Sequence, residues 1–575
     1  MRIDEAFMKY HICLLFALLM PIASMAGDAS DLLSGLQMVG VADSVPCIII
    51  TDTAMSGVFA QYAAQKTCEG TLTDVLTIDA IAEQYVGGDL PQKVRNCIRD
   101  YHQNKYTEWV ILGGDLDVIP GVYVYSQGDY WLSDTYYSNL EYEWNENCNE
   151  FFAEPAYKGD TVDYSVDVYV GRIPCSTPQQ ASAVVSKLTA YLRSPSDSDY
   201  QTRALFTGTN VYGEDDVFQG DDRDSYRLLS ELSAYLPDGY TDTILYATAS
   251  SNVKTELSRG NGLIVNSSQA QDGCSYLTNW TSTWVRSKID HTFFADSMDN
   301  AGRYGVFVNL TCYNADLSNA CAVARDFMLN PSGGGVAYIG ATHYNWSTIG
   351  YPGFHREMFR LMFEEGVTEP AKAMSLAKSV LVPQDGCTDN SFRSAYFSYI
   401  YLGDPQMKIW TATPHIVDVS APDTVYLTEP SITISVTSGG LPVPDVRLCL
   451  SKDASVYVIG ETDDEGNVTF SDLSYNTAGA MSVVATCDNC FTTQDWIQIV
   501  ASCCVGMKGN VDCSPDDVVS LGDFTALNDF LFESMTPLCC EEEADMDGDG
   551  QVSLGDLTAL IDYLFISLEP LDNCD

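Results

Sequence analysis

Five oxygen-bearing residues near the C-terminus are spaced like the ligands of a hard cation. The predicted ligands, at the first, third, fifth, seventh and twelfth positions of one loop, are Asp545, Asp547, Asp549, Gln551 and Asp556. Alternate carboxylates of this kind converge on Ca²⁺, and Gly550 at the sixth position permits the sharp turn that such a loop needs. The spacing therefore predicts a calcium site, with a solvated acidic turn as the alternative.

A related loop with a weaker pattern lies upstream. Residues 520–532, SLGDFTALNDFLF, recur 33 residues later as SLGDLTALIDYLF at 553–565. The ligands predicted for the upstream loop are Asp512, Ser514, Asp516 and Asp523. Asp517 replaces the glycine of the second loop, and Asp tolerates a left-handed backbone better than most residues. We expect weaker calcium binding here, or a solvated acidic turn.

Cys312 is the candidate nucleophile. It follows the apolar stretch YGVFVNL at 304–310, so it stands just beyond the carboxyl end of an expected buried strand. A thiolate in such a position attacks a carbonyl carbon and forms a thioester acyl-enzyme. A buried half-cystine, paired for example with Cys274 or Cys321, is the alternative.

His343 is the histidine that we expect at the same rim as Cys312. The chain has six histidines, and His343 follows GVAYIGAT at 335–342, a stretch expected to form the strand beside that of Cys312. Since parallel strands end at one edge of a sheet, both side chains should emerge there. His343 is then either a substitute general base or a pocket-lining residue. Trp346, in the same loop, either stacks against a substrate side chain or caps the core.

Short apolar runs alternate with longer amphipathic stretches from about residue 36 to residue 410. Seven of these runs are rich in Val, Ile and Leu, and they cover 46–51, 74–78, 108–115, 203–208, 262–266, 304–310 and 335–340. Such runs are typical of parallel strands that helices bury on both faces. We predict an α/β fold with doubly wound parallel sheets in two subdomains, about 27–200 and 201–412.

The pattern changes after Pro414. Short alternating strands with turn signals such as SGG and DDEGN predict an all-β sandwich of immunoglobulin type over 413–500. A small α domain with the two loops follows over 501–575, where six cysteines suggest disulfides that support a small core. Cys487 and Cys490 are either a local disulfide or two unrelated thiols.

Charge and composition limit the partners and the compartment. The formal charge of −50 and a pI near 4.1 exclude nucleic acid as a partner, because its phosphates would be repelled. Residues 11–26, HICLLFALLMPIASMA, predict a secretory signal peptide over 1–26 that is too short to span a bilayer. No later stretch has transmembrane length. We therefore expect a secreted or cell-surface-associated protein, which agrees with the 19 cysteines.

Six segments, taken in order, resemble the gingipain family of cysteine peptidases. They are 48–52, 110–120, 133–141, 163–174, 308–346 and 399–410. The resemblance implies a caspase-like fold over 27–412, an immunoglobulin-like module after it, protein or peptide substrates, and Cys312 as the nucleophile. The family's His-Gly element should follow 262–266, but Gln269 or Ala270 stands there, depending on the alignment, and neither accepts a proton.

The replaced histidine leaves two functions open. The first is a secreted cysteine-type endopeptidase with His343 as a substitute base. The second is a catalytically impaired pseudopeptidase that acts as a binding or scaffold protein. The predicted substrate-pocket residues are Trp346, Gln269 and Ala270. Asp134 and Asp167, in motifs that match the family, either bind structural calcium, orient basic substrate residues, or serve as hydrogen-bonded loop carboxylates.

The C-terminal tail resembles a dockerin, a calcium-folded module that docks onto cohesin domains. Asp rather than Glu at the twelfth loop position and the two loops 33 residues apart carry this resemblance. It implies Ca²⁺ as the cofactor and a cohesin-type partner. A third interpretation of the chain makes this tail the main functional element and the rest its cargo.

Overall fold

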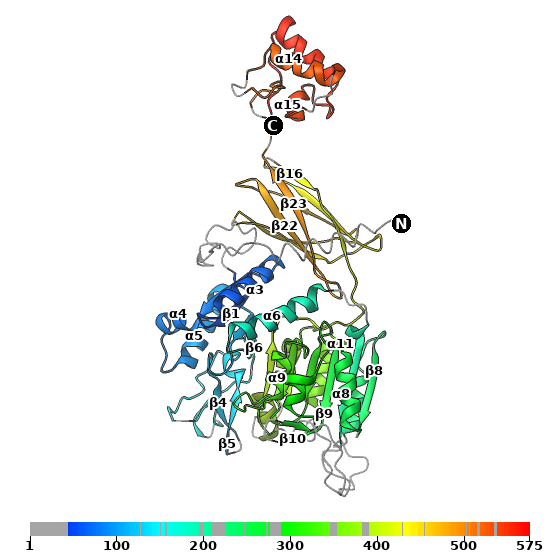
Figure 1. The fold of residues 1–575 in the computed structure, drawn as a ribbon. Coiled ribbons are helices and arrows are strands. Elements are labelled where there is room, and N and C mark those ends of the chain that lie inside the picture. Colours follow the sequence, from blue (N-terminus) through cyan, green and yellow to red (C-terminus); the bar gives the residue numbers. More distant parts are fainter. Residues whose placement is uncertain are drawn as a thin grey trace.

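A computed structural model describes residues 44–574, apart from 127, 150, 156–157, 195–198, 210–224, 247, 272–273, 277–288, 345–352, 382–389, 428, 454, 502, 505, 515–517 and 534–537. The predicted signal peptide, Trp346 and Asp516 lie outside the described residues. Three parts follow one another along the chain: a large α/β part, a β-sandwich and a small helical tail (Figure 1). Among the described residues, no helix has the length and apolar character needed to cross a membrane.

One ten-stranded sheet forms the centre of the α/β part. In spatial order its strands are β2 (Thr73–Thr77), β1 (Cys47–Thr51), β3 (Trp109–Gly113), β6 (Tyr169–Ile173), β14 (Tyr399–Gly403), β13 (Ala337–Ala341), β12 (Val306–Asn309), β9 (Leu263–Ser267), β7 (Arg203–Gly208) and β8 (Thr241–Tyr246). Neighbouring strands run parallel, except β13 and β14. Each of the seven predicted apolar runs overlaps one of these strands, which confirms the α/β class.

Helices pack around this sheet and bury it. They are α3 (Ser56–Cys68), α4 (Ile78–Gln84), α5 (Leu90–Lys105), α6 (Pro178–Arg193), α7 (Ser225–Ser233), α8 (Ser250–Arg259), α9 (Val323–Leu329), α11 (Gly353–Phe363), α12 (Pro370–Leu381) and α13 (Asn390–Ser398). Alternate residues of β1 point to opposite faces, so Cys47 and Ile49 join one apolar core while Ile48 and Ile50 join another. A strand buried in this way on both faces needs a continuous apolar run.

The two halves of the α/β part share this sheet. We predicted separate parallel sheets in residues 27–200 and 201–412; instead, β6 of the first half pairs with β14 of the second, at Arg172 and Leu402. β14 runs antiparallel to β13. The last strand of the α/β part thus joins the halves, and the prediction of two separate parallel sheets is corrected to one mixed sheet.

A two-sheet β-sandwich follows. One sheet holds β15 (Asp418–Ser420), β17 (Ile432–Ser438), β18 (Leu441–Pro442) and β21 (Asn467–Phe470), and the other holds β16 (Thr424–Tyr426), β23 (Thr493–Val500), β22 (Gly479–Thr486), β19 (Arg447–Lys452) and β20 (Val456–Glu461). Side chains from both sheets form one apolar core. Cys487 and Cys490 form a disulfide, so the first of the two alternatives for this CxxC is confirmed.

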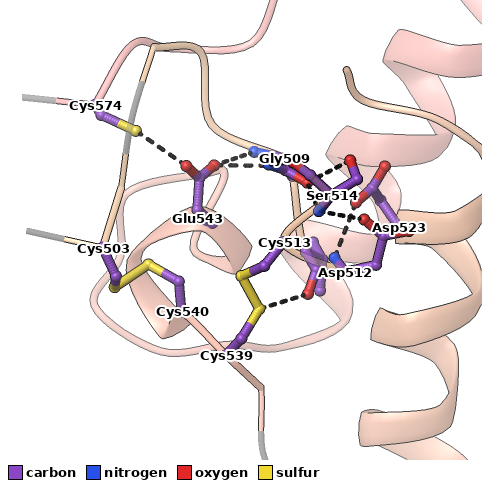
Figure 2. Close-up of a disulfide and its surroundings, with 12 residues drawn as sticks. Cys503, Gly509, Asp512, Cys513, Ser514, Asp523, Cys539, Cys540, Glu543 and Cys574 are labelled. Atoms are coloured by element: carbon purple, nitrogen blue, oxygen red, sulfur yellow. Dashed lines mark hydrogen bonds between the residues drawn. A yellow bond between two sulfur atoms is a disulfide. The ribbon is translucent and has the colours of Figure 1, made fainter. Parts of the chain in front are cut away.

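The tail is built from a duplicated loop and helix. α14 (Leu521–Asn528) and α16 (Leu554–Ile561) both begin with a capping box and both continue into a short π-helical turn, with α15 (Glu541–Ala544) between them. Its apolar core is small. Three disulfides therefore add to its stability, as expected from the cysteine count. Cys503–Cys540 and Cys513–Cys539 are drawn in Figure 2, and the third joins Cys504 to Cys574.

Candidate functional site

Cys312 lies at the rim of the sheet where β9, β12 and β13 end. β12 runs parallel to both neighbours, with Val308 opposite Val265 on one side and Ile339 on the other. Three residues after β12 ends, Cys312 presents a half-buried thiol. The thiol therefore stands where the sequence placed it, beyond a buried strand, and β13 lies beside that strand as expected.

Buried amide side chains shape the turn that carries this thiol. Asn309 Oδ1 accepts hydrogen bonds from the amide (3.2 Å) and hydroxyl (2.8 Å) of Thr311 and from Nδ2 of Asn266 (3.0 Å). Asn309 Nδ2 donates to the Tyr338 hydroxyl at 2.6 Å. Because buried polar groups need partners, these bonds tie the ends of β9 and β12 to β13 and fix the backbone just before Cys312.

His343 contacts the residue that follows the candidate nucleophile. The Tyr313 amide donates to the His343 carbonyl at 3.2 Å, and the two rings are 4.8 Å apart. Trp131 stacks on the imidazole at 4.4 Å, and Oδ2 of Asp129 lies 3.2 Å from its Nε2. Both residues belong to β5 (Asp129–Ser133), which forms a hairpin with β4 (Val122–Ser126). Sequence reasoning missed Asp129 and Trp131, because no local pattern links this hairpin to a loop 200 residues away.

Burial keeps the His343 imidazole neutral at neutral pH. Its side chain is 15% exposed, and the loss of hydration lowers the pKa of His343 more than the nearby Asp129 raises it. Nδ1 is buried and has no hydrogen-bond partner within the described part of the chain. No hydrogen bond between the imidazole and the Cys312 sulfur is present there either. The structure thus brings a neutral histidine to the rim without coupling it directly to the thiol.

Gln269 and Ala270 lie in a small hairpin that follows β9. Their strand, β10 (Gln269–Gln271), pairs antiparallel with β11 (Cys274–Tyr276). The position expected for the family's histidine therefore follows directly after a strand that ends at the rim. The sequence has Gln269 or Ala270 at this position, so no imidazole is available there.

The two acidic residues of the family-like motifs have structural partners. Asp134 is buried and forms a two-pronged ion pair with Arg172, at 2.7 and 2.8 Å. Asp167 Oδ2 accepts a hydrogen bond from the Leu140 amide at 2.5 Å. Of the three roles considered for these residues, these contacts favour that of hydrogen-bonded loop carboxylates.

The second tail loop gathers three carboxylates. One oxygen each of Asp545, Asp547 and Asp549 lies within 4.8 Å of the others. The Asp549 amide donates to Asp545 (3.1 Å) and to Asp547 (3.2 Å), which folds the loop around its own carboxylates. Asp556 Oδ1 accepts hydrogen bonds from the Met546 and Asp547 amides, at 2.7 and 3.1 Å. Hard oxygen donors converging in this way fit Ca²⁺, for which these four aspartates and the carbonyl of the seventh residue would be ligands.

The first tail loop repeats this hydrogen bonding in a register that differs from the prediction. The Ser514 amide donates to Oδ1 of both Asn510 and Asp512 at 2.9 Å, and the Asp512 amide donates to Asp523 at 2.9 Å (Figure 2). By comparison with the second loop, Asn510, Asp512 and Ser514 take the first, third and fifth positions. The predicted register, with Asp512 first, is therefore corrected, and the loop is two residues longer than its partner. Asn510 is a ligand position that sequence reasoning missed; Asp516 falls outside the described residues.

Comparisons with known proteins agree with this arrangement. The structure resembles that of the Arg-specific cysteine proteinase gingipain R (RgpB), with a TM-score of 0.62 and 15% identity over 80% of this chain and 98% of that one. It also resembles the complex of Porphyromonas gingivalis RgpB pro- and mature domains, with a TM-score of 0.61 and 15% identity over 79% of this chain and 100% of that one. At this identity the likeness shows the fold. No curated protein matches the chain. The family model of peptidase family C25 matches residues 42–410, more than half of the sequence, and the chain therefore belongs to peptidase family C25.

Proposed function

We propose that this protein is a secreted cysteine-type endopeptidase with Cys312 as its nucleophile and a calcium-folded docking tail. The observation that carries the proposal is a half-buried thiol beyond the carboxyl end of β12, within a fold of the C25 family. Ligands of open α/β sheets bind beyond the carboxyl ends of the strands, so a peptide at this rim would meet the sulfur.

The reaction would take two steps. The Cys312 sulfur attacks the scissile carbonyl, a carbon–sulfur bond forms, and the carbon–nitrogen bond breaks as the amine leaves. The proton of the thiol passes to a base and then to the leaving amine. Water next attacks the thioester, which releases the carboxylate product and restores the thiol.

We assign the base to His343, with Asp129 as the residue that orients it. Three features support this role: the imidazole is neutral, Asp129 engages Nε2 and leaves Nδ1 as the basic nitrogen, and the His343 carbonyl is bonded to the amide next to Cys312. Catalytic hydrogen bonds are often long before substrate binds, so the lack of a direct bond to the thiol does not exclude the pairing.

The tail carries a repeated apolar surface that suits a protein partner. Leu521 and Leu554, at the starts of α14 and α16, are 63% and 62% exposed, and Phe532 and Phe565 are each 58% exposed. Large exposed apolar side chains are a feature of protein-binding faces. We infer a cohesin-type partner whose binding needs Ca²⁺, because both helices begin at the loops that the ion would order.

The assignment of Cys312 is tested by labelling the full chain with an electrophilic acyloxymethyl-ketone peptide in the presence of calcium and a mild reductant. We expect labelling of the wild type and none of Cys312→Ala. Cys321→Ala, which removes another half-buried thiol of the same segment, is the matched control and should label normally. Labelling that survives in Cys312→Ala would refute the nucleophile.

The second candidate function is a pseudopeptidase that binds peptides without cleaving them. It is favoured by the replacement of the family's histidine at Gln269 or Ala270. Incubation with an unfolded protein substrate separates the two functions. If the wild type cleaves this substrate into fragments, and neither Cys312→Ala nor His343→Ala does, the peptidase is supported. If the wild type is labelled by the probe but produces no fragments, the pseudopeptidase is supported.

A further inference from the structure

A loop of the α/β part has the same internal hydrogen bonds as the calcium loop of the tail. In residues 145–160, the Asn149 amide donates to Oδ1 of Asn145 (3.0 Å) and of Asn147 (3.1 Å). The Phe151 amide in turn donates to Oδ1 of Asn149 at 2.7 Å. In the tail loop, the fifth residue donates to the first and third in the same way, and the seventh donates to the fifth. Asn145, Asn147 and Asn149 therefore stand at the first, third and fifth positions of a calcium-type loop.

The backbone supports this comparison. The fourth position has a left-handed conformation in all three loops: Cys148 has φ 56°, Cys513 in the first tail loop has φ 52°, and Gly548 in the second has φ 72°. A positive φ is uncommon for a residue other than glycine, so its recurrence at one position shows that the same turn is built three times. Geometry alone, however, does not show that a ligand binds.

A buried carboxylate provides the independent observation. Asp160 is 1% exposed, and its Oδ1 has no hydrogen-bond partner within the described residues. Its Oδ2 accepts a hydrogen bond from the Glu154 amide at 2.8 Å. Burial raises the pKa of Asp160, and the amides of Glu146 and Asn147, the second and third loop residues, act against that rise although they lie outside hydrogen-bond geometry for Oδ1. In the tail loop, the aspartate at the twelfth position faces the amides of the second and third residues. Asp160 therefore has the role of that aspartate, with one oxygen left for a ligand.

Glu154 adds a second carboxylate at the same place. Its Oε2 accepts hydrogen bonds from Nδ2 of Asn147 (3.2 Å) and of Asn149 (2.7 Å), so it lies over the asparagines. Its Oε1 is 3.3 Å from Lys158 Nζ, a partly exposed cation that an incoming metal ion would displace. The cluster thus offers two carboxylates and three amide oxygens, all of which are hard donors.

We propose a calcium site in the α/β part whose ligands are Asn145, Asn147, Asn149, Glu154 and Asp160. Oxygen donors of this number and type select Ca²⁺ over softer metals. Two carboxylates give weaker binding than the four aspartates of the second tail loop, since affinity in such loops rises with the charge of the ligands. The proposal does not depend on whether Cys312 cleaves peptides.

The site is connected to the rim of the sheet. Residue 152 of this loop pairs with β4, where the Tyr125 amide donates to the Phe152 carbonyl at 2.9 Å. Tyr125 and Tyr130 of the β4–β5 hairpin pack against Phe151, with ring centroids 4.9 and 5.5 Å apart. Asp129 is the first residue of β5 in the same hairpin and pairs with Ser126 of β4. An ion in this loop would therefore stiffen the element that holds His343.

Terbium luminescence tests the site in the full chain. Tb³⁺ replaces Ca²⁺ in oxygen sites and emits when a nearby tryptophan transfers energy to it. Trp144 directly precedes the loop and is buried, whereas residues 501–575 contain no tryptophan, so the loss of emission in Asp160→Asn identifies the signal that comes from this loop. We expect Tb³⁺ emission from the wild type that falls when Ca²⁺ displaces the Tb³⁺. The emission should be lost in Asp160→Asn and persist in Glu143→Gln, a matched charge change just outside the loop.

A second variant keeps the test decisive if Asp160→Asn fails to fold. Asn147→Asp adds a carboxylate at an exposed position next to Glu154 and Asp160. In a calcium site this change should lower the Tb³⁺ concentration that gives half-maximal emission several-fold, because the ligands gain a charge. In a loop that binds no cation it would only add repulsion. Emission that is unaffected by Asp160→Asn, or Tb³⁺ binding that Asn147→Asp leaves unchanged or weakens, would overturn the proposal.

Discussion

At the scale of single residues, burial lowers the pKa of two histidines of the α/β part, His343 and His355. His343 lies beside a carboxylate, yet its pKa is lowered by burial, to which the stacked ring of Trp131 and the tilted ring of Tyr313 contribute. His355 on α11 is fully buried next to Tyr399, and burial lowers the pKa of His355 to about 3. Neither pKa shift can be predicted from the sequence, because the side chains that bury these histidines come from distant segments of the chain.

His355 gives the fold a specific acid sensitivity. A histidine in the unfolded chain titrates near pH 6.5, so below this pH the unfolded state binds a proton that the folded state excludes. The stability from a neutral His355 is therefore present above about pH 6.5 and is lost as the pH falls toward 3. His355→Gln, which keeps an acceptor for the Tyr399 hydroxyl, should flatten the fall of the unfolding free energy with acid. Urea titrations across this pH window measure the slope, and equal slopes in the two proteins would contradict the account.

At the scale of elements, the sequence predicts what local patterns encode and misses what long-range pairing decides. The apolar runs around Ile49, Ile111 and Val308 predicted their strands, because strands buried on both faces cannot alternate with polar residues. The antiparallel β14 was missed as the link between the halves, since its contact with β6 through Leu402 joins residues 230 positions apart. The 33-residue repeat predicted the helices of the tail but not the ligands of its first loop. That loop has two more residues between Ser514 and Ser520 than the second loop has between Asp549 and Ser553.

The corrected register of that first loop leads to a prediction. If Asn510 is the first ligand, Asn510→Asp should tighten calcium binding by the tail, because it restores the carboxylate that the second loop has at this position. Asp516→Asn, in the extension of the loop, should have little effect. Isothermal titration of the full chain with Ca²⁺ compares the two variants with the wild type. A weakening by Asp516→Asn that exceeds the effect of Asn510→Asp would restore the original register.

At the scale of the whole molecule, the sandwich is packed into the α/β part. Phe491 follows β22 in the sandwich, but it belongs to the apolar core of the sheet and contacts the Trp410 ring at 5.4 Å. Cys449 of β19 likewise joins the other core of the sheet. Hydrogen bonds flank these contacts, from the Thr492 amide to the Leu192 carbonyl at 2.9 Å and from Arg447 to the Gly70 carbonyl at 2.9 Å. Side chains of the sandwich that belong to the cores of the α/β part indicate that the two parts unfold together.

Two phenylalanines of equal burial test this coupling. Phe491 and Phe470 are each 6% exposed, but Phe470 packs only within the core of the sandwich. Truncation of a buried phenylalanine to alanine costs about 3–5 kcal/mol. Phe491→Ala should therefore lower the stability of the α/β part and of the sandwich and separate their unfolding in calorimetry. Phe470→Ala should lower the stability of the sandwich by a similar amount and leave the contact through Phe491 in place. An unchanged unfolding temperature of the α/β part in Phe491→Ala would contradict this coupling. The sandwich would then unfold independently of the α/β part.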